Sequence, residues 1–271
     1  MNDGDLRFDV VILTALVVEE GAVVQALGNC SVQQWRGLPL RVGAVAGQRV
    51  LVFPIRGMGS AGAAQAAQRV IDIWNPARII LVGICGGMPS ASDDVRLGDV
   101  LVPDQVVGYE FGKVTPGGTA RRYEAYRPDI ELLSRARSIQ PGDWVHTIAT
   151  PRPDQSVRAY PLVHVGPVLS GDKVVADPVA RDRLRLAWPQ SVGVEMESLG
   201  VALAAYWNGS GFLVVKAISD FADSAKDDDW HRYSAEAAAR FAIAVLGSVP
   251  AAADRRPQAV PWSVPVTYPG R

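Results

Sequence analysis

Short apolar runs alternate with amphipathic or alanine-rich stretches along most of the chain, and this alternation predicts the fold. Residues 10–13 (VVIL) and 78–82 (RIILV) are runs of β-branched and aliphatic side chains apart from Arg78, which is typical of strands buried on both faces. Residues 61–74 and 234–246 are rich in alanine and predict helices. Strands that alternate with helices form a sheet that helices cover on both sides. We therefore expect an α/β fold with a mostly parallel, mixed central sheet.

The same patterns supply the remaining elements and the domain limits. Further strands are predicted at 48–55, 99–103, 105–109, 163–169 and 212–218, helices at 19–27 and 128–139, a strand end that runs into a helix at 193–206, and loops at 115–126 and 141–161. Prolines and small residues dominate from 248 onward, and such a segment cannot build a core. A single domain is therefore expected over 8–247, followed by a disordered tail over 248–271.

Polar and glycine residues collect at the ends of the predicted strands. Ligands of such sheets bind outside the carboxyl ends of the strands, so these residues are candidates for a site. They are Thr14, 56–59, 83–87, 170–172, 195–197 and 219–220. The glycine-rich segments 56–59 and 83–87 are expected to be turns, and neither matches a dinucleotide fingerprint or a phosphate loop.

Composition excludes several classes of function. The chain has 271 residues, of which 48% are hydrophobic and 20% charged, and its formal net charge is -1. Without a basic excess, nucleic acid is not an expected partner. Two distant cysteines and three scattered histidines favour neither a disulfide nor a metal site, so no metal and no cofactor are expected. No signal peptide or membrane-spanning run is recognisable, which predicts a cytoplasmic protein without a membrane partner.

Three acids near the ends of apolar segments are the strongest candidates for chemistry. Glu195 and Glu197 flank Met196 before a further apolar stretch, and Asp220 follows Ser219 where a buried strand ends. Acids in such surroundings need a partner or a ligand. A carboxyl group in a partly apolar pocket can also keep a proton for donation. The alternatives are a helix cap or a structural ion pair for the two glutamates, and an N-cap for Asp220.

A fourth acid lies at the start of a predicted helix. Glu19 and Glu20 open the helix at 19–27, where a favourable interaction with the helix dipole is explanation enough for either of them.

With these residues in place, the chain resembles the nucleoside phosphorylase and nucleosidase superfamily. Within it, the chain is most similar to the methylthioadenosine/S-adenosylhomocysteine nucleosidases and to related bacterial nucleosidase domains of signalling and defence proteins. The most specific residues are 194–197 followed by 218–220, and the resemblance covers about 8–246. It implies a nucleoside phosphorylase-like fold, a small-molecule purine nucleoside or nucleotide as ligand, and a homodimer or larger homo-oligomer.

The resemblance also implies a role for individual residues. Glu19 matches the acid that activates the attacking water, Glu197 the acid that holds the ribose hydroxyls, and Asp220 the acid that protonates purine N7. The remaining matches are substrate-binding: Met196 and Glu195 near the sugar, Ser219 beside Asp220, Val174 and Val175 at the adenine edge, Met58 beside the 5′ substituent, and Ile84, Cys85 and Gly86 lining the site.

Departures from the family pattern concern the nucleophile and the substrate. Phosphorylases of this superfamily hold phosphate where this chain has Leu81 and Ile84, and an apolar pair cannot hold a phosphate dianion, so water is the expected nucleophile. Val174 stands where an aromatic ring often stacks on the base, a role left to Phe221. Arg56 introduces a cation near the 5′ end, where it could hold a phosphate.

We therefore expect a purine N-ribosyl hydrolase that releases adenine from a nucleoside such as methylthioadenosine or S-adenosylhomocysteine. The alternatives are, in order, a nucleotide N-glycosidase of bacterial defence or signalling, a non-catalytic nucleoside-sensing module, and a phosphorylase.

Overall fold

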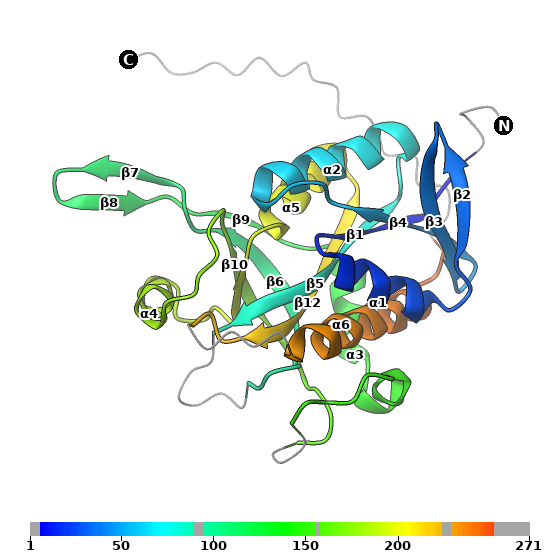
Figure 1. The fold of residues 1–271 in the computed structure, drawn as a ribbon. Helices are drawn as coiled ribbons and strands as arrows, with labels where there is room; N and C mark the ends of the chain where they lie inside the picture. The colour runs from blue at the N-terminus through cyan, green and yellow to red at the C-terminus, as the bar shows by residue number, and fades with distance from the viewer. Residues whose placement is uncertain (1–5, 89–94, 155–157, 224–228, 252–271) are drawn as a thin grey trace.

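The computed structural model describes residues 6–88, 95–154, 158–223 and 229–251 (Figure 1). The strands are β1 (Val10–Thr14), β2 (Ser31–Trp35), β3 (Leu38–Val45), β4 (Gln48–Pro54), β5 (Arg78–Gly87), β6 (Val100–Gly108), β7 (Gly112–Thr115), β8 (Gly118–Arg121), β9 (Glu124–Tyr126), β10 (Val163–Ser170), β11 (Gly193–Glu195) and β12 (Gly211–Asp220). The helices are α1 (Val17–Leu27), α2 (Gly59–Trp74), α3 (Ile130–Ser138), α4 (Pro178–Ala187), α5 (Ser198–Asn208) and α6 (Asp229–Ser248), with two 3₁₀ turns at Pro141–Asp143 and Val145–Thr147.

One mixed sheet carries all the strands except the β7–β8 hairpin, which projects from the body (Figure 1). Its strand order is β11-β10-β6-β12-β5-β1-β4-β3-β2, with β9 added beside β6. The pairs β1–β4, β1–β5, β5–β12 and β6–β10 are parallel, whereas β3–β4 and β2–β3 are antiparallel. Because β11 pairs with both β10 and β5, the strands β5, β12, β6, β10 and β11 close into a ring.

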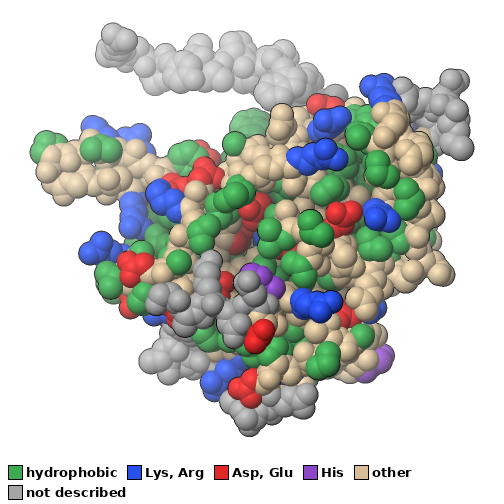
Figure 2. All heavy atoms as spheres, viewed as in Figure 1, with side chains coloured by type: hydrophobic (Ala, Val, Ile, Leu, Met, Phe, Trp, Pro, Cys, Tyr) green, Lys and Arg blue, Asp and Glu red, His purple; other side chains and the backbone are tan. Residues whose placement is uncertain are grey.

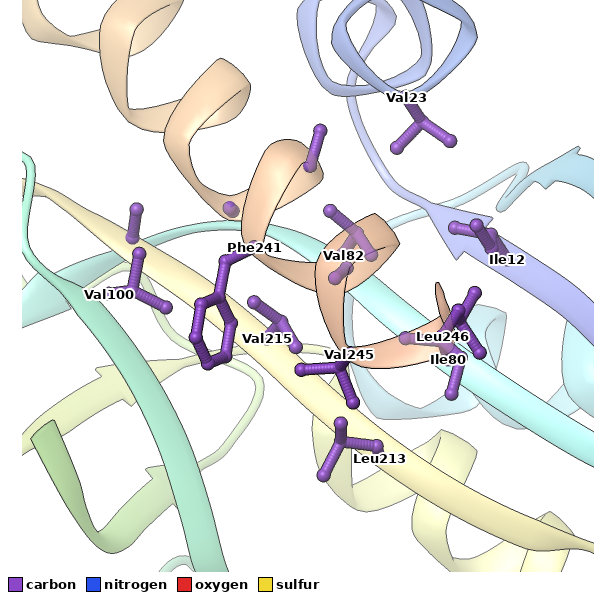
Figure 3. Close-up of a cluster of buried hydrophobic side chains, with 14 of the residues drawn as sticks. Ile12, Val23, Ile80, Val82, Val100, Leu213, Val215, Phe241, Val245 and Leu246 are labelled. Carbon is purple, nitrogen blue, oxygen red and sulfur yellow. The ribbon is translucent and has the colours of Figure 1, made fainter. Parts of the chain in front are cut away.

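Helices cover both faces of the sheet, as Figure 1 shows: α2 and α5 on one side, and α1, α3 and α6 on the other. Successive strand residues point to opposite faces, so β5 sends Ile79 and Leu81 toward α2 and α5 and sends Ile80 and Val82 toward α1 and α6. Figure 3 shows the second of these cores, in which Phe241 of α6 lies among side chains of the central strands. Burial on both faces explains why these strands are continuous apolar runs.

The structure confirms the expected α/β class, with a mixed central sheet flanked by helices. It corrects several elements. The segment 83–87 is not a turn but the second half of β5, because β12 and β11 pair with it on either side. The strands predicted at 99–103 and 105–109 are the single strand β6, and the loop predicted at 115–126 contains the end of the hairpin and β9.

The ends of the predicted domain are only partly described. Residues 252–271, most of the expected disordered tail, lie outside the described residues. Its first residues are packed on the domain, since Val249 is buried and the Pro250 carbonyl oxygen accepts a hydrogen bond from Arg78. In the described part of the chain, no helix is both long and apolar enough to cross a membrane.

Candidate active site

A cavity of about 260 Å³ opens where β5, β11 and β12 end beside the first turn of α1. We call it the acidic cavity because four carboxylates line it. Its lining consists of Ala15, Leu16, Glu19, Met58, Ile84, Cys85, Gly86, Lys173, Val174, Val175, Val194, Glu195, Met196, Glu197, Ser219, Asp220 and His231. Residues from widely separated stretches of the chain therefore meet at one end of the sheet.

The carboxylate of Glu19 is held by the main chain at the floor of this cavity. One oxygen, Oε2, accepts hydrogen bonds from the backbone N–H groups of Ala15 and Leu16, both at 2.8 Å. The other, Oε1, accepts one from the N–H of Ile84 on β5, also at 2.8 Å. The residue is only 1% exposed. Glu19 thus lies in the first turn of its own helix, where the simpler explanation by the helix dipole also applies, and it connects α1 to β5 inside the cavity.

Gly83 makes this position of Glu19 attainable. A Cβ atom at residue 83 would lie 2.3 Å from Glu19 Oε1, closer than any contact between real atoms allows. The glycine in β5 is therefore a requirement of the site rather than of a turn.

Glu195 and Glu197 face a buried cation. Lys216 of β12 is 1% exposed, and its Nζ lies 3.4 Å from Glu195 Oε2 and 3.3 Å from Glu197 Oε2. Glu195 also accepts the N–H groups of Glu197 and Ser198, so it caps the first turn of α5. Both simpler explanations hold for this pair. Glu197 lies at the cavity wall, and among the described residues none donates a hydrogen bond to its Oε1, so Glu197 is the member available to a ligand.

The proton affinities of Glu197 and Lys216 are shifted by their neighbours. Burial raises the pKa of Glu197, the Lys216 ammonium opposes that shift, and the neighbouring charge of Glu195 adds to it. Burial by itself would lower the pKa of Lys216, but the carboxylates of Glu197 and Glu195 raise it above its ordinary value, so the lysine stays protonated.

Asp220 lies at the end of β12, opposite Gly86 of β5. Its Oδ1 accepts the N–H of Ala222 at 2.8 Å, and its Oδ2 lies 3.1 Å from the Ser219 hydroxyl. Ala222 has a left-handed backbone, with φ of 52°, which is uncommon for a residue with a Cβ. The chain therefore turns sharply behind Asp220 and leaves its carboxyl group facing the cavity.

The structure gathers most of the residues expected from the sequence and leaves two elsewhere. Met58 and Val174 lie at the cavity mouth, where they are 77% and 55% exposed. Arg56 lines a different cavity, because Gly57, with φ of 124°, turns the chain between it and Met58. Phe221 points away from the acidic cavity into a smaller one beside Trp230, so within the described residues it is not in position to stack on a base there.

Three polar residues of the site were not expected from the sequence. Lys216 could have been found, since a cation within a buried strand needs a partner just as the acids do. Lys173, which forms an ion pair with Glu110, and His231, in the first turn of α6, carry no pattern that separates them from surface residues. Among the described residues, no cluster of histidine, cysteine and acidic side chains is arranged to hold a metal ion.

Leu81 and Ile84, the two residues that depart from the phosphorylase pattern, have different surroundings. Leu81 is fully buried against α2 and α5 and does not reach the acidic cavity, so its identity says less about phosphate than the sequence suggested. Ile84 does line the cavity, and it presents an apolar side chain there.

Comparison with known proteins agrees with this arrangement. A family model described as "Phosphorylase superfamily" matches residues 9–249. The chain belongs to the phosphorylase superfamily.

The curated proteins that resemble the chain include ATP nucleosidases and 5′-methylthioadenosine/S-adenosylhomocysteine nucleosidases. It is 31% identical to a death domain-containing ATP nucleosidase of Amphimedon queenslandica, over 68% of this chain and 36% of the relative, and 27% identical to the ATP nucleosidase Cap17 of Escherichia coli, over 85% and 49%. The chain thus spans less than half the length of each of these two relatives. It is 26% identical to a 5′-methylthioadenosine/S-adenosylhomocysteine nucleosidase of Chromohalobacter salexigens, over 89% of this chain and 96% of the relative.

Solved structures of superfamily members share the fold. The 5′-methylthioadenosine/S-adenosylhomocysteine nucleosidase of Neisseria meningitidis, in complex with methylthio-immucillin-A, superposes with a TM-score of 0.70 at 21% identity and covers 89% of this chain and 99% of its own. A mutant of the Helicobacter pylori enzyme, with 5′-methylthioadenosine in its active site, gives 0.72 at 18% identity, over 90% and 100%.

Proposed function

We propose that the protein is a purine N-ribosyl hydrolase that releases adenine from a nucleoside such as methylthioadenosine or S-adenosylhomocysteine. The observation that carries the proposal is the set of four carboxylates around one small cavity, three of them with fixed orientations. Such an arrangement suits a reaction in which positive charge develops on the ribose ring.

The proposed reaction breaks the bond between C1′ and N9 and forms a bond between C1′ and a water oxygen. Asp220 gives a proton to N7, so the base leaves as neutral adenine. Glu19 orients the water and accepts a proton from it, while Glu197 accepts hydrogen bonds from the ribose hydroxyls. Met196 and Glu195 are the residues proposed beside the sugar, and Val174 and Val175 those beside the adenine edge. The products are adenine and a free ribose derivative.

Water rather than phosphate is the proposed nucleophile. Among the described residues that line the acidic cavity there is no arginine, and Lys173 is already bound to Glu110. A phosphate dianion placed beside four carboxylates would meet repulsion without compensating donors.

A nucleotide N-glycosidase is the second candidate. Two relatives named ATP nucleosidases and the position of Arg56, separated from Met58 by one glycine, favour it. The proposal further includes a cytoplasmic location and a homodimer or larger homo-oligomer, which cell fractionation and sedimentation would test.

The deciding experiment is a panel of methylthioadenosine, S-adenosylhomocysteine, adenosine, AMP and ATP, each incubated with and without phosphate, with products identified by mass. We expect adenine and a free ribose derivative at equal rates in both conditions. Strict dependence on phosphate, with a ribose 1-phosphate as product, would identify a phosphorylase. Binding without any cleavage would identify a sensing module.

A further inference from the structure

A second cavity, of about 610 Å³, lies next to the acidic cavity between α1, α2 and the β3–β4 pair. Its lining consists of Glu20, Leu38, Pro39, Leu40, Arg41, Val52, Phe53, Pro54, Arg56, Gly62, Gln65, Ala66 and Arg69. We call it the arginine cavity. Three guanidinium groups face one carboxylate in it, so its lining carries a formal excess of positive charge, the reverse of its neighbour.

The three arginines come from three different elements. Arg41 belongs to β3, Arg56 to the segment after β4, and Arg69 to α2, where it shares a helix face with Gln65 four residues earlier. Their convergence is a product of the fold and not of a run of basic residues in the sequence. In Figure 2, blue side chains gather over the part of the surface formed by α2.

Internal ion pairs account for little of this charge. Arg41 Nε lies 3.9 Å from Glu20 Oε1, a long and partly exposed contact. Within the described residues, neither Arg56 nor Arg69 forms an ion pair. Arginines that converge in this way on a partly apolar hollow repel one another, and an anion with several oxygens would relieve that repulsion.

Residues close together in the chain line the two cavities. Glu19 lines the acidic cavity and Glu20, its neighbour on α1, lines the arginine cavity. In the same manner, Met58 lines the acidic cavity and Arg56 lines the arginine cavity. Because these residues are two positions apart in the chain, their Cα atoms lie at most about 7 Å from each other. These parts of the two linings are therefore within the length of one ligand.

The direction of such a ligand follows from the proposed function, on which this step rests. With the purine at Asp220 and the ribose at Glu197, the 5′ substituent is expected beside Met58, the residue that the family resemblance assigns to it. A phosphate chain cannot turn back among four carboxylates. The nearest concentration of positive charge is the arginine cavity.

We propose that the arginine cavity binds the phosphate chain of a nucleoside 5′-polyphosphate, with Arg41, Arg56 and Arg69 as its ligands. Arginine suits this task because its planar fork of N–H donors matches phosphate oxygens in pairs. All three arginines are exposed, so their guanidinium groups are open to a ligand that enters from solvent. The acidic cavity then provides the chemistry, and the arginine cavity extends its substrates to nucleotides with several phosphates, the second candidate above.

Inorganic tripolyphosphate tests the site without any reaction. Calorimetry on the full chain should show binding to the wild type, and the double variant Arg41→Gln/Arg69→Gln should weaken it by about a hundredfold, since each charge-assisted hydrogen bond contributes about tenfold or more. Glu20→Gln should strengthen binding, because it removes the one carboxylate of the lining. Arg135→Gln is the matched control, an exposed arginine on α3 at the opposite side of the molecule.

Kinetics test the link to the substrate. The ratio of kcat/KM for ATP to kcat/KM for adenosine should fall by about tenfold or more in Arg41→Gln, Arg56→Gln and Arg69→Gln, and Tm should confirm that each variant folds. Tripolyphosphate that fails to bind the wild type, or that binds the double variant equally well, would overturn the site. Tripolyphosphate binding without cleavage of any nucleoside or nucleotide would overturn the hydrolase and leave the phosphate site standing.

Discussion

At the scale of single residues, the two oxygens of Asp220 have different neighbours. Oδ1 accepts the Ala222 N–H, whereas Oδ2 faces the Ser219 hydroxyl at the cavity wall. A carboxyl group held in this way can keep one oxygen for the turn and use the other for a ligand.

Asp220→Asn separates these two tasks. The amide fills the same space and can still donate to N7, so folding and ligand binding should survive, but it cannot supply a proton. The rate of adenine release should fall by about 10²–10⁴-fold. A substrate with a better leaving group should recover much of that loss. Normal cleavage of adenosine derivatives by the variant would show that the proton comes from another group, and unfolding would show that Asp220 is only a cap.

Gly83→Ala tests whether the position of Glu19 is essential. The added methyl group would collide with Glu19 Oε1, so the carboxylate must move. A displacement of about 1 Å at a reacting group can cost about 100-fold in rate, and we expect kcat to fall by that order. Gly21→Ala is the control: it lies in α1 with open space around it, and the change should stabilise the helix by about 0.5–1 kcal/mol without affecting the rate.

Lys216 should set the pH at which activity is lost in acid. Its positive charge favours the ionised form of Glu197, so Lys216→Gln should raise the pKa of Glu197 further. Glu197 would then become protonated earlier as the pH falls, and the acid limb of the pH profile of kcat/KM should move to higher pH. Lys216→Arg keeps the charge and should shift the limb less, and Lys113→Gln, on the projecting hairpin, should not shift it. An unchanged acid limb in Lys216→Gln would mean that Glu197 does not control activity.

At the scale of elements, the strands that the sequence predicts well are those buried on both faces. The run at 79–82 is apolar throughout because α2 and α5 cover one side and α1 and α6 the other. By contrast β2 lies at the edge with mostly exposed residues, and its polar sequence, SVQQW, resembles a loop. The continuation of β5 through its glycines depends on β11 and β12, which are distant in the chain and invisible to a local pattern.

Part of the candidate site could likewise be predicted from the sequence, and part of it could not. Acids at strand ends could be predicted, because the carboxyl ends of parallel strands meet at one edge. The direction in which the side chains point could not be predicted. Gly57, with its positive φ, is enough to direct Arg56 toward the arginine cavity instead of the acidic cavity.

The contact of α6 with the sheet depends on Phe241. Its ring is fully buried and packs edge-on against Trp144, with 5.3 Å between the ring centroids. Phe241→Ala should lower the free energy of unfolding by about 3–5 kcal/mol, as expected when a large core side chain leaves a cavity. Urea denaturation measures this value, and Phe111→Ala, at a 47% exposed ring, should change it far less. Equal losses in the two variants would contradict the packing shown in Figure 3.

At the scale of the whole molecule, Asp99 joins segments that are far apart in the chain. Its buried carboxylate contacts the Arg158 guanidinium at 2.6 Å and His164 Nε2 at 2.9 Å, and it accepts the N–H of Leu162. Burial acts to raise the pKa of Asp99, but the hydrogen bonds from His164, Leu162 and Arg158 outweigh it and hold the pKa below its usual range. The group stabilises the ring of strands where β6 and β10 begin.

Asp99 should therefore contribute stability that depends on pH. Because its pKa is lower in the folded state, the contribution is present above the pKa of the unfolded chain and is lost as the pH falls through the folded value. Asp99→Asn should cost about 3–5 kcal/mol at neutral pH, as for a broken buried ion pair, and the difference from the wild type should shrink in acid. Urea unfolding at several pH values measures both effects. The exposed Asp72→Asn should stay within about 0.5 kcal/mol, and a difference for Asp99→Asn that does not change with pH would refute the assignment.

Main-chain N–H groups hold the acids of the acidic cavity, and this limits which substitutions can alter the site during evolution. The N–H groups that hold Glu19, Glu195 and Asp220 belong to Ala15, Leu16, Ile84, Glu197, Ser198 and Ala222. Every amino acid except proline supplies such a donor. Side chains at Ala15, Leu16 and Ile84, which line the cavity, can therefore be exchanged over evolutionary time, and with them the shape of the pocket, while the orientation of the carboxylates persists. Proline is the one replacement that these positions exclude on hydrogen-bonding grounds.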